Sequence, residues 1–159
     1  MKRFVFTLMT AALLVPALRA PVSAWSLPAD ELELMLDKPT LTYAEVARFV
    51  LDAAETEAPL EAEAAFRFVQ ERQWLPSGVT ADENARLGPV SLLIMQAFNL
   101  KGGLSYTFFP NAHFAYREMS HQRIIQDRAD PEMSVSGDWL FFMIGRVLAV
   151  QSGESVSGE

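Results

Sequence analysis

Apolar residues recur along most of the chain three or four positions apart, rather than in the alternation typical of strands. One such stripe shares a single helix face: Val46, Phe49, Val50 and Ala53. Thr40 or Thr42 is its predicted N-cap. The spacing predicts an all-α protein, in which only 104–110 is interpreted as extended. The predicted helices cover about 30–36, 42–54, 60–73, 89–99, 113–123 and 136–150.

The same pair of helices recurs along the chain. An offset of fifty residues aligns Ala65-Phe66-Arg67 with Ala115-Tyr116-Arg117, and Leu93-Ile94 with Met143-Ile144. An offset of forty-four residues aligns Phe49-Val50 with Leu93-Ile94. Because one offset holds through both helices of a pair, the loops between them have equal length, which chance similarity of amphipathic helices does not require. The sequence therefore predicts three degenerate helix-loop-helix repeats, at about 28–56, 60–100 and 110–150.

The third repeat carries the most distinctive motifs. They are, in order, His113-Phe114-Ala115-Tyr116, Arg123-Ile124-Ile125, Ala129-Asp130-Pro131, Val135-Ser136-Gly137-Asp138 and Ile144-Gly145-Arg146-Val147-Leu148. Together these motifs resemble the S-layer homology repeat. That repeat has an aromatic-Ala pair, a bulky apolar step, a loop with Asp and Pro, and a helix that starts with Val-Thr-Arg-x-Glu. The resemblance extends over about 28–150 and implies a compact pseudo-threefold bundle whose grooves bind cell-wall polysaccharide.

The chain departs from that family at the residue that contacts the glycan. In the family, the Arg of the Thr-Arg-x-Glu motif contacts anionic sugar substituents. The matching positions here are Tyr43, Leu87 and Gly137, and Arg86 lies one residue from the middle one. Without a bidentate cation, an acidic glycan loses its main charged contact. The resemblance therefore supports the fold and not the ligand.

The N-terminal segment 1–24 has the organisation of a secretory signal peptide. Lys2 and Arg3 precede an almost wholly apolar stretch, 4–18. Small residues, as at a signal-peptide cleavage site, come just before the bond that follows Ala24. That stretch of about fifteen residues is shorter than the roughly twenty that a membrane-spanning helix needs. We expect cleavage after Ala24, a periplasmic or extracellular mature domain over 25–150, and no stable membrane insertion.

Composition narrows the class of partner. The leader contains three of the thirteen basic residues and no acid, so the mature chain carries ten basic and twenty acidic residues. This balance argues against nucleic acid and against anionic membrane surfaces as partners. Ten acids lie between Asp30 and Glu63 and predict an acidic outer face. The chain has no cysteine, so an apolar core must stabilise it, and the Ser, Gly and Glu-rich tail 151–159 is expected to be disordered.

Two groups of polar residues have the composition of metal sites. Glu118 and His121 form Glu-x-x-His, one half of a di-iron motif, but the pattern does not recur in the second repeat, so a solvated helix face is the better interpretation. Asp127, Asp130 and Glu132 crowd one loop, where they either cap and turn the chain or bind calcium, although their spacing is not that of an EF-hand.

The sequence contains no nucleophile elbow and no phosphate loop, so we assign no catalytic residue, cofactor or resident metal.

The aromatic residues of 104–114 either seal the core between repeats or form an exposed partner surface. The candidate ligand- or partner-binding residues are Tyr43, Arg86, Tyr106, Phe108, Phe109 and Arg128. The sequence favours a non-catalytic cell-envelope module that acts in protein–protein assembly or as a structural accessory. The alternative is an anchor module that binds cell-wall polysaccharide or peptidoglycan.

Overall fold

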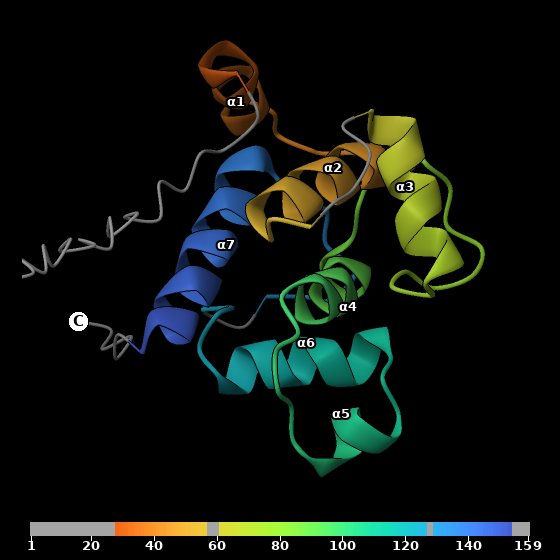
Figure 1. Cartoon of the computed structure of the whole chain (residues 1–159), viewed down its shortest axis with the longest axis vertical. Coiled ribbons are helices and arrows are strands. Elements are labelled where there is room, and N and C mark those ends of the chain that lie inside the picture. The colour runs from red at the N-terminus through yellow and green to blue at the C-terminus, as the bar shows by residue number, and fades with distance from the viewer. Residues whose placement is uncertain (1–27, 57–60, 127–128, 154–159) are drawn as a thin grey trace, which may run out of the picture.

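The computed structural model describes residues 28–56, 61–126 and 129–153. The described residues form helices joined by loops and contain no strand, which confirms the predicted all-α class (Figure 1). The helices are α1 (Ala29–Leu36), α2 (Tyr43–Ala53), α3 (Ala62–Glu71), α4 (Leu87–Ala97), α5 (Leu104–Phe108), α6 (Ala112–His121) and α7 (Gly137–Ser152).

Helix α4 lies at the centre, with α2 on one side and α6 on the other (Figure 1). Helix α3 packs on α2, α5 packs on α6, and α7 packs against α1 and α2. Phe49, Leu93 and Met143, from α2, α4 and α7, are at most 1% exposed and belong to one continuous hydrophobic core. The apolar stripes seen in the sequence therefore all face the same interior.

Three short segments meet in the core just before α2, α4 and α7. Leu41 N–H donates to Val135 C=O at 2.9 Å, and Val135 N–H donates to Ala85 C=O at 2.9 Å. Ala85 N–H closes the ring by donating to Leu41 C=O at 2.8 Å. All three residues are fully buried, so the ring satisfies backbone groups that water cannot reach. The three helices consequently start from one common point.

Local start signals explain where two of the helices begin. Of the two threonines predicted as caps of α2, Thr42 is the N-cap. Its hydroxyl accepts from Glu45 N–H at 3.3 Å, and the Glu45 carboxylate accepts from Thr42 N–H at 2.9 Å, which is a capping box. In α6, the Asn111 side chain accepts from Phe114 N–H at 3.0 Å.

Four helices end at a non-glycine residue with positive φ: Glu55, Gln73, Asn99 and Arg123. At the end of α3, Trp74 N–H donates to Val69 C=O and Gln73 N–H donates to Gln70 C=O, both at 2.9 Å. This pair of bonds is the Schellman motif, which favours glycine at the residue in the left-handed region. The chain therefore holds side chains in a strained conformation at these ends.

We expect Gln73→Gly to raise the free energy of unfolding by about 1 kcal/mol, because glycine adopts the left-handed conformation without the steric cost of a Cβ. Chemical denaturation of wild type and variant measures the change. Arg72→Gly is the matched control: Arg72 has right-handed helical φ and ψ, so glycine there is expected to lower stability. Equal effects of the two substitutions would contradict this explanation of the helix end.

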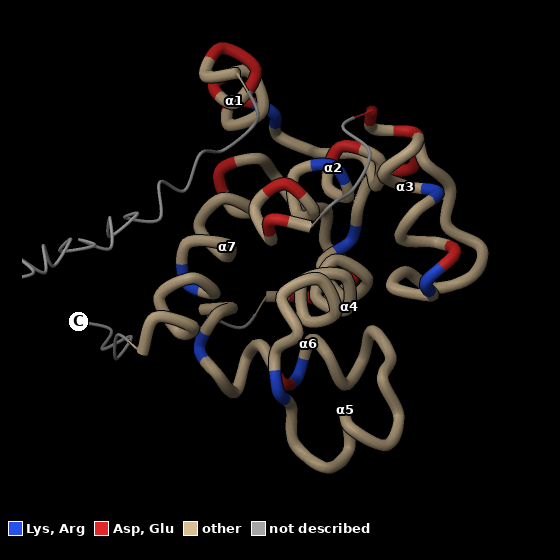
Figure 2. The backbone as a smooth tube through the Cα atoms, in the orientation of Figure 1, with Lys and Arg blue, Asp and Glu red and all other residues tan. Residues whose placement is uncertain are grey.

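Charge is unevenly distributed over the fold. Figure 2 shows acidic residues on α1, α2 and α3 at one end of the molecule, and none on α5 at the opposite end. This agrees with the acidic face predicted from 30–63 for the part of that segment that the structure describes.

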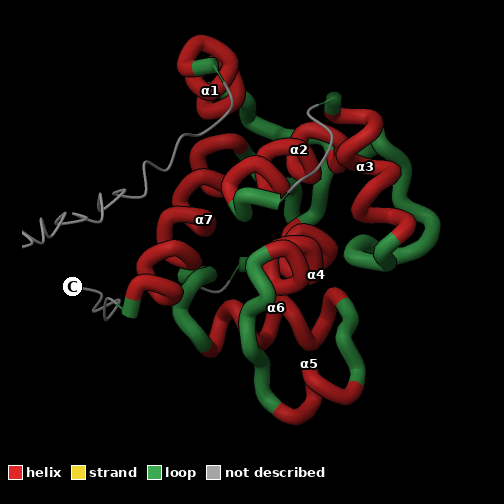
Figure 3. The backbone as a smooth tube through the Cα atoms, in the orientation of Figure 1, coloured by secondary structure: helices red, strands yellow, loops and turns green. Residues whose placement is uncertain are grey.

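The prediction of an extended segment at 104–110 was wrong: residues Leu104–Phe108 form the short helix α5 (Figure 3). The prediction followed the β-propensity of its aromatic residues, which depends on a neighbouring strand that is not present among the described residues. Instead, Tyr106 packs into the core, and the Thr107 hydroxyl donates to Gly103 C=O at 3.1 Å.

Several sequence predictions fall at or beyond the edges of the described ranges. The leader 1–24, the loop residues Asp127 and Arg128, and residues 154–159 lie outside them. Helix α7 continues to Ser152, so the first two residues of the predicted tail are helical. Within the described ranges, none of the helices has the length and apolar character needed to cross a lipid bilayer.

Candidate functional site

Two of the candidate residues, Tyr43 and Arg86, are neighbours with different surroundings. Tyr43 lies in the core, and its hydroxyl accepts from Arg86 N–H at 3.3 Å. The exposed Arg86 guanidinium donates to Glu132 at 2.8 Å and lies 3.6 Å from Glu83. An acidic ligand would have to displace these carboxylates to reach the cation. Exposed ion pairs of this kind contribute little to stability.

The positions that match the glycan-binding Arg of the S-layer homology motif are all buried. Tyr43 and Leu87 are at most 1% exposed, and Gly137 is buried against α1. A Cβ at Gly137 would lie 1.7 Å from the carbonyl oxygen of Met35. None of these positions presents a side chain to a ligand in this conformation.

Burial raises the pKa of both Tyr43 and Tyr106 above the usual 10.0. For Tyr43, the hydrogen bond from Arg86 N–H partly offsets the burial, while the nearby Glu83 carboxylate adds to it. For Tyr106, the hydrogen bond that Gln96 Nε2 donates to its hydroxyl at 2.9 Å is the opposing influence. Both phenols are therefore favoured in their neutral form in the folded protein.

This sets the sign of a pH dependence. The stabilisation is fully present below pH 10, where both tyrosines are neutral in the folded and unfolded chain, and it is lost as pH rises toward the higher folded-state pKa values. We expect the free energy of unfolding to fall as the pH rises above about 10, and the fall to be shallower in the double variant Tyr43→Phe, Tyr106→Phe. Denaturant unfolding across this range measures it, and identical slopes would contradict the assignment.

The aromatic segment 104–114 is divided between core and surface. Tyr106 is buried and bonded to α4 through Gln96, so it seals the core. Leu104, Phe108 and Phe109 are 78%, 71% and 67% exposed. We call these three residues the α5 patch. Each of the two alternatives considered for this segment thus describes part of it.

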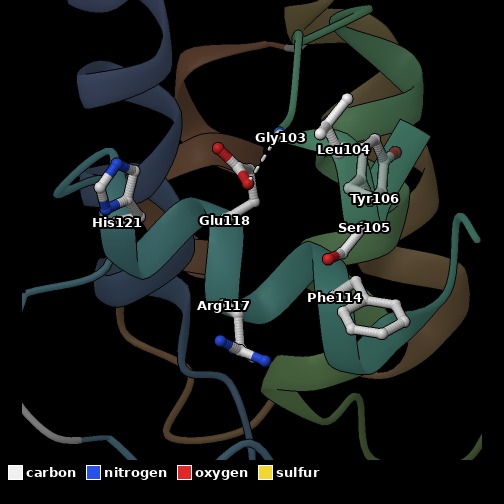
Figure 4. A pocket seen from close by; sticks show the side chains of 8 residues that line it. All are labelled: Gly103, Leu104, Ser105, Tyr106, Phe114, Arg117, Glu118 and His121. Carbon is white, nitrogen blue, oxygen red and sulfur yellow. Dashed lines mark hydrogen bonds between the residues drawn. The ribbon is translucent and has the colours of Figure 1, made fainter. Parts of the chain in front are cut away.

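A pocket of about 280 Å³ lies between α5 and α6 beside this patch (Figure 4). Its polar lining includes Ser105, Arg117, Glu118 and His121, a combination that invites comparison with a catalytic site. In Figure 4, the Glu118 side chain lies between those of His121 and Ser105. Ser105 and His121 are therefore not adjacent, as a nucleophile and its general base have to be.

Glu118 has a structural role in this pocket. Its Oε2 accepts from Gly103 N–H at 2.9 Å, and its Oε1 accepts from Gln122 Nε2 at 3.3 Å. Gln122 Nε2 also donates to Lys101 C=O at 2.8 Å, so α6 holds both residues that lead into α5. Among the described residues, no three His, Asp or Glu side chains gather closely enough to hold a metal ion.

A second pocket, of about 400 Å³, lies between α1 and the start of α2 and α3, and ion pairs line it. Lys38 pairs with Glu45, and Arg48 donates to both carboxylate oxygens of Glu31, the longer contact being 2.9 Å. Burial opposes ionisation of Glu45, but hydrogen bonds from Lys38 and Thr42 outweigh it and lower the pKa of Glu45. These contacts attach α1 to α2, which is a sufficient explanation for the charges.

Helix α7 carries an apolar outer side that the sequence analysis did not single out. Phe142 and Leu148 are 43% and 39% exposed, and a Cβ added to Gly145, which lies between them, would meet no atom within 4 Å. From Trp139 to Ser152 the only charged residue is Arg146, whose Nε donates to Arg123 C=O at 2.7 Å. We call Phe142, Gly145 and Leu148 the α7 face. The near-continuous apolar sequence of 139–150 was a signal that could have predicted it.

Fold and sites together define an all-α domain with two exposed apolar surfaces and, among the described residues, no group of three His, Asp or Glu side chains that could hold a metal ion. Searches against protein-family models, curated proteins and solved structures find no match for the chain.

Proposed function

We propose that this chain is a non-catalytic, exported helical module of the cell envelope, built from three S-layer-homology-like repeats, that assembles with a protein partner through the α7 face. The observation that carries the proposal is the exposed apolar side of α7, on which Phe142 and Leu148 flank the open position at Gly145. Exposed apolar surface of this kind marks an interaction site in soluble proteins. Arg146, the single cation of 139–152, already donates to a backbone carbonyl, so apolar side chains dominate the contacts that the α7 face can make.

The hydrogen-bond ring supports the three-repeat interpretation. Its members Leu41, Ala85 and Val135 are separated by the same forty-four and fifty residues that align the helices. A second set of bonds runs in the opposite direction around the three segments: Tyr43 N–H to Glu83 C=O, Leu87 N–H to Met133 C=O and Gly137 N–H to Lys38 C=O. The donors lie at equivalent positions, and so do the acceptors Glu83 and Met133, whereas Lys38 lies one residue before the position equivalent to Glu83; this near-regular pattern supports a pseudo-threefold bundle.

The helix ends add an independent observation. The left-handed residues Glu55 and Asn99 follow the second helices of repeats one and two, and they are forty-four residues apart. Gln73 and Arg123 follow the first helices of repeats two and three, fifty residues apart. The two offsets that came from apolar residues therefore also relate backbone conformations, which amphipathic periodicity alone does not produce.

Co-purification from the native envelope tests the proposal. The chain, expressed with its own leader and carrying a C-terminal affinity tag, is recovered after export, and its mass shows whether it begins at Trp25. We expect one partner protein to co-purify in a fixed ratio with the wild type and to be lost from a variant with Phe142→Ser and Leu148→Ser. Phe108→Ser, at an exposed position on α5, is the matched control and retains the partner.

Sedimentation with purified cell-wall sacculi tests the alternative, a polysaccharide-binding anchor. We expect no saturable sedimentation, because the three family-motif positions are buried and Arg86 is paired with acids. Saturable binding that survives the α7 substitutions would contradict the protein-assembly proposal and favour the glycan-binding one.

A further inference from the structure

The α5 patch has no role in the proposal above. Its large apolar side chains are unusually exposed for a connection between two helices. Three large apolar side chains, Leu104, Phe108 and Phe109, are about two-thirds or more exposed within six residues. Helix α5 packs against α6 at the end of the molecule that lies farthest from α1 (Figure 1). The patch is therefore an exposed apolar tip at one end of the molecule, and of its three residues only Leu104 also lines the pocket between α5 and α6.

Buried contacts hold this tip in place. Tyr106, the one buried residue of α5, accepts a hydrogen bond from Gln96 of α4 at 2.9 Å. From α6, Glu118 accepts from Gly103 N–H and Gln122 donates to Lys101 C=O. Because the backbone is held at Lys101 and Gly103 and Tyr106 is anchored in the core, the exposed apolar side chains cannot be withdrawn into the core by a small adjustment.

The charge around the tip is opposite to that of the whole chain. Between Asn99 and Gln126 the sequence contains three cations, Lys101, Arg117 and Arg123, and one acid, Glu118. That acid is engaged with Gly103 N–H, whereas the Arg117 side chain lines the pocket beside Leu104 and is exposed. The acids that give the chain its net charge of −7 gather mainly toward α1, α2 and α3 (Figure 2). The net charge therefore does not describe the surface that α5 presents.

We propose that α5 docks the protein onto the surface of an anionic lipid bilayer, with Leu104, Phe108 and Phe109 entering the interfacial layer and Lys101 and Arg117 facing the headgroups. Interfacial binding draws on buried apolar area together with attraction between cations and anionic lipids, and this end of the molecule supplies both. The acidic end, being remote, is kept away from the lipid charge. The proposal departs from the expectation, drawn from the total charge, that the protein avoids anionic membranes.

The shape of the tip favours a bilayer over a protein partner. Residues that dominate protein interfaces fill pockets on the other side and are surrounded by a polar rim. Here the apolar residues are about two-thirds or more exposed, and the exposed cations Lys101 and Arg117 lie just before α5 and on the neighbouring helix α6, so both kinds of side chain are available to the interface and headgroups of a bilayer. The α5 patch and the α7 face belong to different helices, so one can be changed without the other.

Vesicle sedimentation tests the proposal with the exported full chain. Large unilamellar vesicles of phosphatidylcholine with about 30% phosphatidylglycerol are compared with vesicles of phosphatidylcholine alone. We expect binding to the anionic vesicles that weakens at high salt and on the neutral ones. Phe108→Ser combined with Phe109→Ser is expected to lower the affinity about tenfold or more, and Lys101→Gln combined with Arg117→Gln to remove the preference for anionic lipid.

Phe142→Ser on α7 is the matched control and is expected to bind vesicles like the wild type. All variants share the same N-terminal sequence, so any contribution from the leader cancels in the comparison. Far-ultraviolet circular dichroism verifies that each variant is folded, which is expected because the replaced side chains are exposed. Absence of wild-type binding, or equal binding of the α5 double variant, would overturn the proposal. Capture of an envelope protein that depends on α5 without vesicle binding would assign the tip to a protein partner instead.

Discussion

Gly137→Ala is expected to lower the free energy of unfolding by about 2–3 kcal/mol and to release α1 from the bundle. The new Cβ would lie 1.7 Å from the Met35 carbonyl oxygen and 2.7 Å from its carbonyl carbon. Both atoms are backbone, so no rotamer change relieves the overlap. Helix α1 has no fully buried residue, so its displacement is less costly than distortion of α7. The hydrogen bond from Gly137 N–H to Lys38 C=O, 3.0 Å long, is lost with it.

Amide hydrogen exchange measures this effect directly, because exchange in Ala29–Leu36 should accelerate more than in α4 or α6. Gly145→Ala in the same helix is the matched control. An added Cβ at Gly145 meets no atom within 4 Å, so this substitution is expected to stabilise the protein by about 0.5–1 kcal/mol. Destabilisation of equal size at both glycines would contradict the close approach of α1 to α7.

Leu93→Ala is expected to cost about 2–5 kcal/mol of unfolding free energy. Leu93 is fully buried on the central helix α4, where α2 and α6 enclose it from two sides. Neighbouring helices cannot all move inward at once, so the deletion leaves a cavity as well as losing buried apolar area.

Leu104→Ala removes the same atoms from a side chain that is mostly exposed, so its cost is expected to stay within about 0.5 kcal/mol. Denaturant unfolding of the two variants under one condition measures the difference. A loss of less than about 1 kcal/mol for Leu93→Ala would show that the core does not close around α4 in solution.

Much of the fold could be predicted from the order of the residues. Helical spacing identified the major helices, and one of the two predicted caps, Thr42, is the N-cap of α2, where Glu45 completes a capping box. Pro89 lies in the first turn of α4, as its position suggested, although the helix begins two residues earlier. These features depend on neighbours within one or two turns, which a single sequence contains.

Segment 104–110 could not be assigned in this way. Its aromatic residues favour a strand if another strand pairs with them, and a helix if one side chain can enter an apolar core. The second condition holds because Tyr106 reaches α4 and bonds to Gln96, ten residues away along the chain. The outcome depends on tertiary contact, which intrinsic propensity does not encode.

The candidate surfaces were predicted in part. Phe108 and Phe109 were selected for their aromatic character, and they are exposed. Tyr43 was selected by alignment with a family motif, and it lies in the core because the segment before α2 enters the hydrogen-bond ring. The exposure of Phe142 follows from the position of α7 at the edge of the bundle, which the apolar sequence of that helix does not reveal.

Site-specific photo-crosslinking in the intact envelope tests most directly whether the protein acts by docking a protein partner on α7. A photoreactive phenylalanine analogue replaces Phe142 in one variant and the exposed Arg67 of α3 in another. We expect illumination to yield one protein adduct of defined mass from position 142 and none from position 67. Adducts of equal yield at both positions, or none at position 142 in an envelope that contains the folded protein, would contradict the proposed function.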